Sequence, residues 1–260
     1  MRIVNPSLRK VMQRSQAGEM CIEVQPATYG GIAKKTILFG VVTILAAILS
    51  VVLLNVAFAK QDAQLLTVVL TGALLCAIPM IVVSLVIAFR PDTVKVLGFV
   101  YSLLQGALLG VLVFFVDSYY PGIALAAVLG TLIVFVVCAS FNKMLEVRVS
   151  GKFVRIMLIA FASFIALELV LMLLSLFVPN LQALFTVYLW VQLLINICCI
   201  FYATVLLLWD LQTAEDIVNG GADKKYEWIV AYSLVTTLVY LYIQILELLL
   251  RLLILFGRRN

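Results

Sequence analysis

Four ionisable side chains lie within or directly at the end of long apolar stretches of the 260-residue chain: Glu168, Glu247 and Arg251 within them, and Asp210 at the end of one. An ionisable group in such a stretch is costly to place in hydrocarbon, so each is a candidate functional residue. Glu247 precedes Arg251 by four residues, which favours an ion pair on one helix face. Glu168 has no basic residue in its own stretch, so it must carry a proton, face water or bond to another helix.

A second set of acidic residues lies in the segment from 210 to 227, which we interpret as a connector. Besides Asp210, its acidic residues are Glu215, Asp216, Asp223 and Glu227. Carboxylate oxygens are the ligands that Ca²⁺ prefers, so the connector is a candidate for attracting cations at the mouth of a pore. The spacing is not that of an EF-hand, and a solvated connector without a ligand is the simpler alternative.

The residue types that are missing exclude several classes of chemistry. The chain has no histidine, and therefore no HExxH metal site, no Ser-His-Asp triad and no histidine proton relay. It has no P-loop, and its five cysteines form no CxxC pair. The missing motifs argue against a pump or a membrane protease and predict no cofactor, which leaves passive conduction, sensing or partner binding, with Ca²⁺ as an ion that the acidic connector could attract.

The elements that must position these residues are membrane-spanning helices. The chain is 65% hydrophobic and 12% charged, far from the composition of a soluble domain. Its apolar runs are long enough to cross a bilayer as helices, which predicts an all-α integral membrane protein in contact with lipid. We expect seven spans, at residues 36–59, 65–89, 96–116, 122–141, 156–178, 183–209 and 229–256.

Two smaller features concern how these spans pack. Gly106 and Gly110 are four residues apart in the third span, a spacing that lets helices approach closely. Pro79 lies in the second span and is expected to kink it.

The positive charges predict the orientation. Fourteen of the eighteen Lys and Arg residues fall in the N-terminal arm and in alternate loops, whereas the opposite loops contain only Lys60. The positive-inside rule therefore places the N-terminus in the cytosol. Residues 1–35 form a cytosolic arm and residues 36–260 a single helical bundle. The net charge of +5 reflects these loops, not a nucleic-acid surface. The last segment either crosses fully or re-enters, and the former is favoured.

Several stretches, in shared order and spacing, resemble the Bax inhibitor 1 family, specifically its bacterial YccA-like branch. They are NPSL at 5–8, TYGGIAKKT at 28–36, YSLLQGALLG at 101–110, YPGI at 120–123, WDL at 209–211 with Glu215, KKYEW at 224–228 and TTLVYLY at 236–242. The resemblance implies six helices around a central C-terminal helix, no enzymatic activity and a bacterial cytoplasmic membrane. It also implies a proton-sensitive calcium leak, and for the YccA-like branch an association with a membrane-bound AAA protease.

The resemblance also suggests how a proton would be sensed. The family's counterpart of Asp210 is one half of a carboxylate pair, and two carboxylates held close together share a proton because both cannot ionise cheaply. The second acid of the pair falls on Gln244, a departure from the family pattern, and Glu247 is a candidate substitute. At about 1.5 Å per residue, Gln244 lies roughly 24 Å along the helix from Trp228, so its contact with Asp210 is a hypothesis.

Two functions follow. In the first, Asp210 with Gln244 or Glu247 gates a proton-sensitive cation leak. In the second, the N-terminal arm binds a membrane-bound AAA protease, which the bundle then restrains.

Overall fold

The computed structural model describes residues 26–61, 63–145, 149–175 and 189–257, and these residues are helical apart from short connections. The helices are α2 (Tyr29–Ala59), α3 (Ala63–Leu75), α4 (Ala77–Phe89), the 3₁₀ turn η1 (Pro91–Thr93), α5 (Val94–Tyr119), α6 (Ile123–Leu145), α7 (Gly151–Ser175), α9 (Leu189–Asn219) and α10 (Tyr226–Gly257). Within the described residues the only strand-like pairing is an isolated bridge between Pro26 and Asp223.

Six stretches of the described residues are long and apolar enough to cross a membrane. They are Tyr29–Ala59, Leu66–Phe89, Pro91–Tyr119, Ile123–Asn142, Gln192–Asn219 and Tyr226–Leu255. Outward-facing side chains such as Ile37, Leu45 and Ile133 are more than half exposed, which is the expected state of a surface that contacts lipid. The all-α membrane fold is confirmed. Helix α7, with 25 residues, occupies the place of the expected fifth span and is also long enough to cross.

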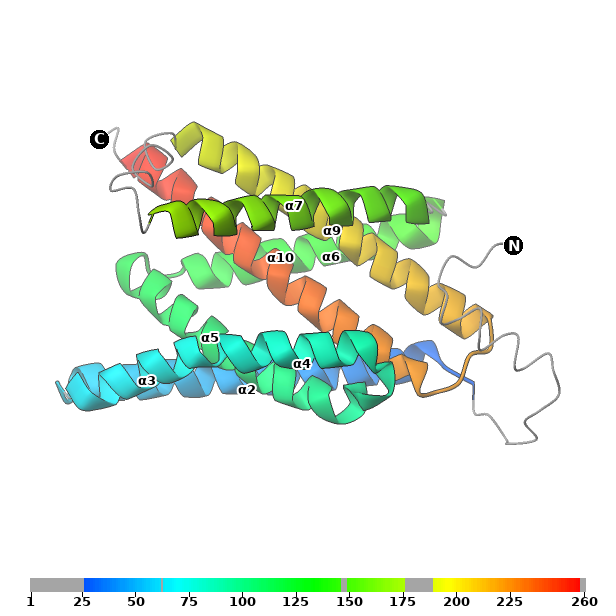
Figure 1. Cartoon of the computed structure of the whole chain (residues 1–260), viewed down its shortest axis with the longest axis horizontal. Helices are drawn as coiled ribbons and strands as arrows, with labels where there is room; N and C mark the ends of the chain where they lie inside the picture. Colours follow the sequence, from blue (N-terminus) through cyan, green and yellow to red (C-terminus); the bar gives the residue numbers. More distant parts are fainter. Residues whose placement is uncertain (1–25, 62, 146–148, 176–188, 258–260) are drawn as a thin grey trace.

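Helix α10 lies at the centre of the bundle. It runs diagonally between a layer formed by α2 to α5 and a layer formed by α6 and α7, with α9 crossing beside it (Figure 1). It packs against α9, α2, α6 and α5, whereas α4 packs on α5 and α7 packs on α9. The C-terminal helix is therefore central, as predicted, with four helices directly around it and the others farther out.

Two glycines of α5 allow α2 to approach it. A Cβ atom at Gly106 would collide with the Thr43 carbonyl and the Ala46 side chain, and one at Gly110 would collide with the Ala47 carbonyl. The packing role predicted for this pair is confirmed. It joins the first and third spans into the most extensive helix contact of the described residues.

The second span is interrupted, as Pro79 predicts. Helix α3 ends at Leu75 and α4 begins at Ala77. Proline has no N–H to donate to the carbonyl of the fourth residue before it, which here is Leu75. The break therefore falls where the missing hydrogen bond would have been.

Several helices extend beyond the spans that we expected, two of them by about two turns or more. Helix α2 begins at Tyr29 and not at 36, capped by the Thr28 side chain. Helix α9 continues to Asn219, so the connector expected from 210 to 227 is wrong over its first ten residues. Ala214 and Ile217 are buried in the core. Because these apolar residues recur at helical spacing, one face of the segment packs against neighbouring helices and the segment stays helical although charged residues lie on its other face.

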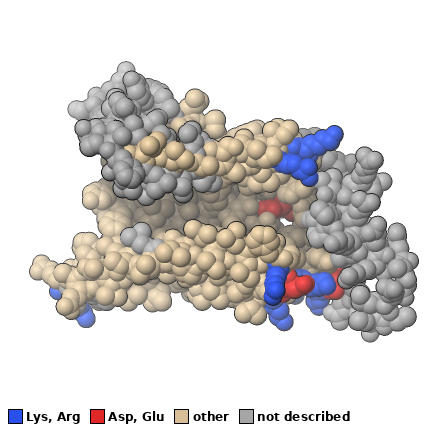
Figure 2. All heavy atoms as spheres, in the orientation of Figure 1, with Lys and Arg blue, Asp and Glu red and all other residues tan. Residues whose placement is uncertain are grey.

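Charged groups of the described residues gather at one end of the bundle. In Figure 2 most of the visible lysine, arginine and acidic atoms lie at that end, and the described surface between them and the other end is almost free of charged residues. The same face is hollowed between the two layers, with acidic atoms visible in the hollow.

Candidate functional site

Asp210 is held between α9 and α10 by two hydroxyl groups. Its carboxylate is buried, with 8% of the residue exposed. Ser233 Oγ donates a hydrogen bond of 2.6 Å to Oδ1, and Thr237 Oγ1 donates one of 2.6 Å to Oδ2. The two donors are four residues apart, so they lie on one face of α10 and together reach one side chain of α9.

Small and aliphatic residues bring the two helices close enough for these bonds. Ala203, Leu207 and Ala214 of α9 pack in one buried cluster with Leu234 and Leu241 of α10. The carboxylate is thus surrounded by apolar packing, with two hydroxyls as its hydrogen-bond partners among the described residues. Such a site is sensitive to the charge of its one acidic group, because burying an ionised carboxylate costs more than burying a neutral one.

Protonation of Asp210 would change the hydrogen bonds that can form between α9 and α10. An ionised carboxylate accepts from both hydroxyls, whereas a protonated one carries a donor on one of its oxygens. One hydroxyl must then turn away or accept instead of donating. The geometry therefore couples the proton on Asp210 to the contact between α9 and α10.

A second polar cluster lies farther along the same helix pair. Asn196 Nδ2 donates to Gln244 Oε1 at 2.9 Å and to Glu247 Oε2 at 3.3 Å. Glu247 forms an ion pair with Arg251, whose guanidinium also donates to the Gln192 carbonyl. The ion pair expected from the four-residue spacing is confirmed. Asn196 is 2% exposed, and its Oδ1 has no hydrogen-bond partner among the described residues.

Asp210 does not meet Gln244 or Glu247, so the contact that we hypothesised is not formed. Asp210 bonds at Thr237, and Gln244 is seven residues later, roughly 10 Å along α10. On α9 the partner of Gln244 is Asn196, fourteen residues before Asp210, or about 21 Å. Two crossing helices bring together residues that lie at the same distance along the bundle axis. Asp210 and Gln244 lie at different distances along that axis.

Glu227 also differs from its predicted role, because it is buried in a local network. It is fully buried, accepts from the Thr28 backbone N–H at 2.8 Å and forms a 2.6 Å ion pair with Lys35. A Cβ atom at Gly31 would collide with its carboxylate. Lys35 also donates to the Lys224 carbonyl and lies 4.7 Å from the centre of the Trp228 ring. Glu227 therefore fastens α2 to α10 and is not free to attract a cation.

The other acidic residues of the connector are spread out. Glu215 Oε2 lies 3.5 Å from Asn142 Nδ2, Asp223 pairs with Lys225 at 3.9 Å, and Asp216 has a partner of its own. Among the described residues no three acidic or cysteine side chains are grouped so that they could hold a metal ion. The side chain of Glu168, in α7, lies outside the described part of the chain.

Sequence reasoning missed the hydroxyl donors Ser233 and Thr237 and the amide Asn196. Their only signal is position: the two hydroxyls share a helix face, and Asn196 is a polar residue in the middle of an apolar run. Lys35 was counted for orientation and not recognised as the partner of Glu227.

Comparison with known families gives one match. The model of a family described as Bax inhibitor 1 like matches residues 5–253. A search of curated proteins found no match to the chain.

Proposed function

Because the chain belongs to the Bax inhibitor 1-like family of membrane proteins, we propose that it is a non-enzymatic, proton-sensitive cation leak protein. In this proposal, ionisation of Asp210 loosens the contact between α9 and α10, protonation tightens it, and Ca²⁺ is a permeant ion. The protein lies in a bacterial cytoplasmic membrane with its N-terminus in the cytosol, which the one-sided distribution of Lys and Arg supports. Its assignment to the YccA-like branch stays a prediction.

The observation that carries the proposal is the position of Asp210. A carboxylate that is 8% exposed bridges two long helices through two 2.6 Å hydrogen bonds. Ionisation adds the cost of burying a charge, which the two hydrogen bonds offset only in part, so the ionised form favours a loose helix pair. We take the part that is not offset to be of the order of one neutral buried hydrogen bond, about 0.5–1.5 kcal/mol. That amount changes an equilibrium between a tight and a loose helix pair by about twofold to tenfold.

The second polar cluster has a different part in this mechanism. Asn196, Gln244, Glu247 and Arg251 tie α9 to α10 at another height. We therefore assign proton sensing to Asp210 alone. We propose that the cluster keeps α9 and α10 in contact at its own position while the contact around Asp210 loosens.

The proposal is tested by calcium flux. Full-length protein is reconstituted in liposomes that enclose a calcium-sensitive dye, and flux is measured from pH 5 to pH 8. We expect the wild-type flux to fall by about twofold to tenfold as the pH falls, because the proton stabilises the tight helix pair. Asp210→Asn cannot ionise, so its flux should stay near the acid value and change little with pH.

The matched control is Asp117→Asn. Asp117 accepts a hydrogen bond from the Gly122 backbone N–H, and an asparagine oxygen can accept the same bond. This variant should therefore keep the wild-type pH profile. Flux no greater than in protein-free vesicles would refute the leak, and an unchanged pH profile in Asp210→Asn would refute the role of Asp210.

A further inference from the structure

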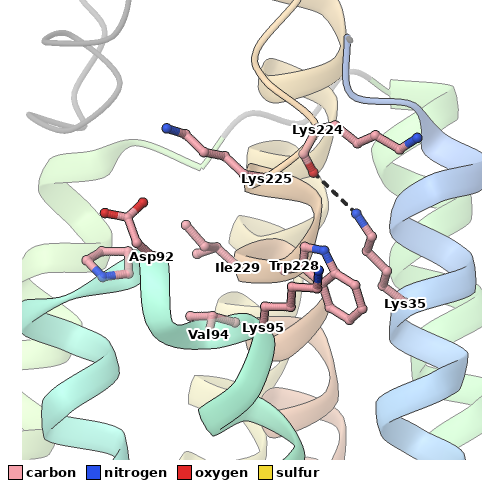
Figure 3. Close-up of a pocket in the computed structure, with 9 residues that line it drawn as sticks. Lys35, Asp92, Val94, Lys95, Lys224, Lys225, Trp228 and Ile229 are labelled. Atoms are coloured by element: carbon pink, nitrogen blue, oxygen red, sulfur yellow. Dashed lines mark hydrogen bonds between the residues drawn. The ribbon is translucent and has the colours of Figure 1, made fainter. Parts of the chain in front are cut away.

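A cavity of about 470 Å³ lies where α2, α5 and α10 meet at the charged end of the bundle. We call it the lysine cavity. Its wall is formed by Lys35 of α2, by Pro91, Asp92, Val94 and Lys95 around the start of α5, and by Lys224, Lys225, Trp228 and Ile229 around the start of α10. Figure 3 shows Lys95 and Lys225 on different walls, with Trp228 between α10 and α2.

The lysines of this cavity are not equivalent. Lys35 is neutralised by the buried Glu227 at 2.6 Å. Lys225 pairs with the exposed Asp223 at 3.9 Å, a type of pair that contributes little. Lys95 has no hydrogen-bond or ion-pair partner among the described residues. Lys95 therefore brings to the cavity a positive charge without a partner among the described residues, and Lys225 brings one that its exposed partner offsets only weakly. Asp92 on the cavity wall opposes both charges.

An adjoining cavity extends the positive region. It has a volume of about 380 Å³, shares Lys35 and Lys224 with the first, and adds Lys34, the first turn of α2 and Glu227, whose charge is paired with Lys35. The side chain of Lys224 extends toward α2 in Figure 3. The first turn of a helix carries partial positive charge, so it adds to the positive charge of the lysines.

The position of the lysine cavity and its apolar wall indicate the chemistry of its occupant. It lies at the ends of three membrane-crossing stretches, where the phosphates of phospholipids are found. Val94, Trp228 and Ile229 give it an apolar side, and tryptophan is typical of the membrane interface. Basic pockets between helix ends are the usual binding sites for anionic headgroups.

We propose that the lysine cavity binds the phosphate group of an anionic phospholipid, with Lys95 and Lys225 as its main contacts. The bound lipid would cover the junction of α2, α5 and α10. This inference does not depend on the proposed cation leak, because lipid binding is measured without any flux.

The test compares an anionic with a neutral lipid. Full-length protein in neutral detergent is titrated with dioleoyl phosphatidylglycerol or dioleoyl phosphatidylcholine, and the lipid-bound fraction is measured by native mass spectrometry. We expect tighter binding of phosphatidylglycerol. Replacing a lysine near lipid phosphate is expected to cost about fivefold in affinity, so the double variant Lys95→Gln, Lys225→Gln should bind phosphatidylglycerol about 25-fold more weakly.

Three controls make the result specific. Lys60→Gln removes the same charge at the other end of α2 and should leave the affinity unchanged. Asp92→Asn removes the opposing charge and should increase the affinity. Glycerol 3-phosphate in large excess, at constant ionic strength, should not displace the lipid.

The proposal fails if phosphatidylcholine binds as tightly as phosphatidylglycerol, or if the double variant keeps the wild-type affinity. Displacement of the lipid by glycerol 3-phosphate would also overturn it, because it would identify a site for free phosphate.

Discussion

At the residue scale, the arrangement around Asp210 offsets the cost of placing an acid inside a membrane protein. A carboxylate without donors in an apolar environment is strongly destabilising. Ser233 and Thr237 supply one donor to each carboxylate oxygen. Hydrogen bonds to a charged group contribute about 1.5–3 kcal/mol, so the two hydroxyls stabilise the ionised form of Asp210 where it is buried.

Replacing one donor tests this arrangement. Thr237→Val keeps the shape of the side chain and removes its hydroxyl, so a buried carboxylate oxygen loses its donor. We expect the variant to be about 1–3 kcal/mol less stable, measured as the free energy of SDS-induced unfolding in mixed micelles at pH 8. In the Asp210→Asn background the same substitution should cost less, since no charge is left without a donor.

Thr213→Val is the matched control for Thr237→Val. Thr213 donates to the carbonyl of Trp209, four residues earlier in its own helix. Its loss should therefore change the stability little. Equal costs for the two valine substitutions would contradict a special role for Thr237.

The pairing of Asp210 with these hydroxyls could not be predicted from the sequence. Most threonines of the described helices bond to the carbonyl four residues earlier, as Thr43, Thr131 and Thr204 do. A hydroxyl that bonds across helices has the same residue type and the same apolar neighbours. Which hydroxyl faces the acid depends on how far α9 is shifted along the bundle axis relative to α10. That shift is set by the packing of the two helices.

At the element scale, the apolar spans were predictable, but their ends were less so. Hydropathy defines the part of a helix that faces lipid, and the expected 65–89 agrees with the observed Leu66–Phe89. The polar last turns of α9 continue as helix because one face of them, with Ala214 and Ile217, is buried against other helices. The mostly exposed first turns of α2 begin at the Thr28 cap. The amino-acid composition of a polar turn does not show whether that turn is buried against another helix.

The contact between α2 and α5 gives a prediction at this scale. Gly106→Leu would place a side chain where the Thr43 carbonyl and the Ala46 side chain already lie. Overpacking a tight contact usually costs about 1–3 kcal/mol, and backbone that cannot move raises this cost. We expect a loss of at least this size in the unfolding free energy, measured as above.

The control for this prediction is Gly40→Leu in α2, where an added Cβ atom would meet no neighbouring group within 4 Å. It should leave the stability nearly unchanged. An equal loss in the two variants would argue against close packing as the cause.

At the scale of the whole molecule, three polar clusters join the central helix to its neighbours. Glu227 fastens α10 to α2 near the charged end, Asp210 fastens it to α9 farther along, and Asn196 fastens it to α9 farther still. The stretches of α10 between them pack mainly through apolar contacts, and Tyr242 adds a 3.5 Å hydrogen bond from its hydroxyl to the Ala124 carbonyl of α6. Of these three, the Asp210 cluster alone rests on a single acid with no basic partner among the described residues, so it is the junction whose strength depends on one proton.

The N-terminal segment gives the last prediction, which separates the second candidate function from the first. Residues 1–25 lie outside the described part of the chain. From Ala27 the chain is fixed: its N–H donates to the Ala222 carbonyl at 2.8 Å, and Thr28 is bonded to Glu227. Deleting residues 1–24 should therefore leave the unfolding free energy and the pH profile of calcium flux unchanged.

If this segment binds a membrane-bound AAA protease, the deletion should abolish co-purification of the two proteins from membranes that contain both. Deleting residues 1–28 removes the anchoring bonds as well and should lower the stability, which shows that the shorter deletion stops before the folded part. Co-purification that survives the shorter deletion would refute binding through this segment, whatever the outcome of the flux measurement.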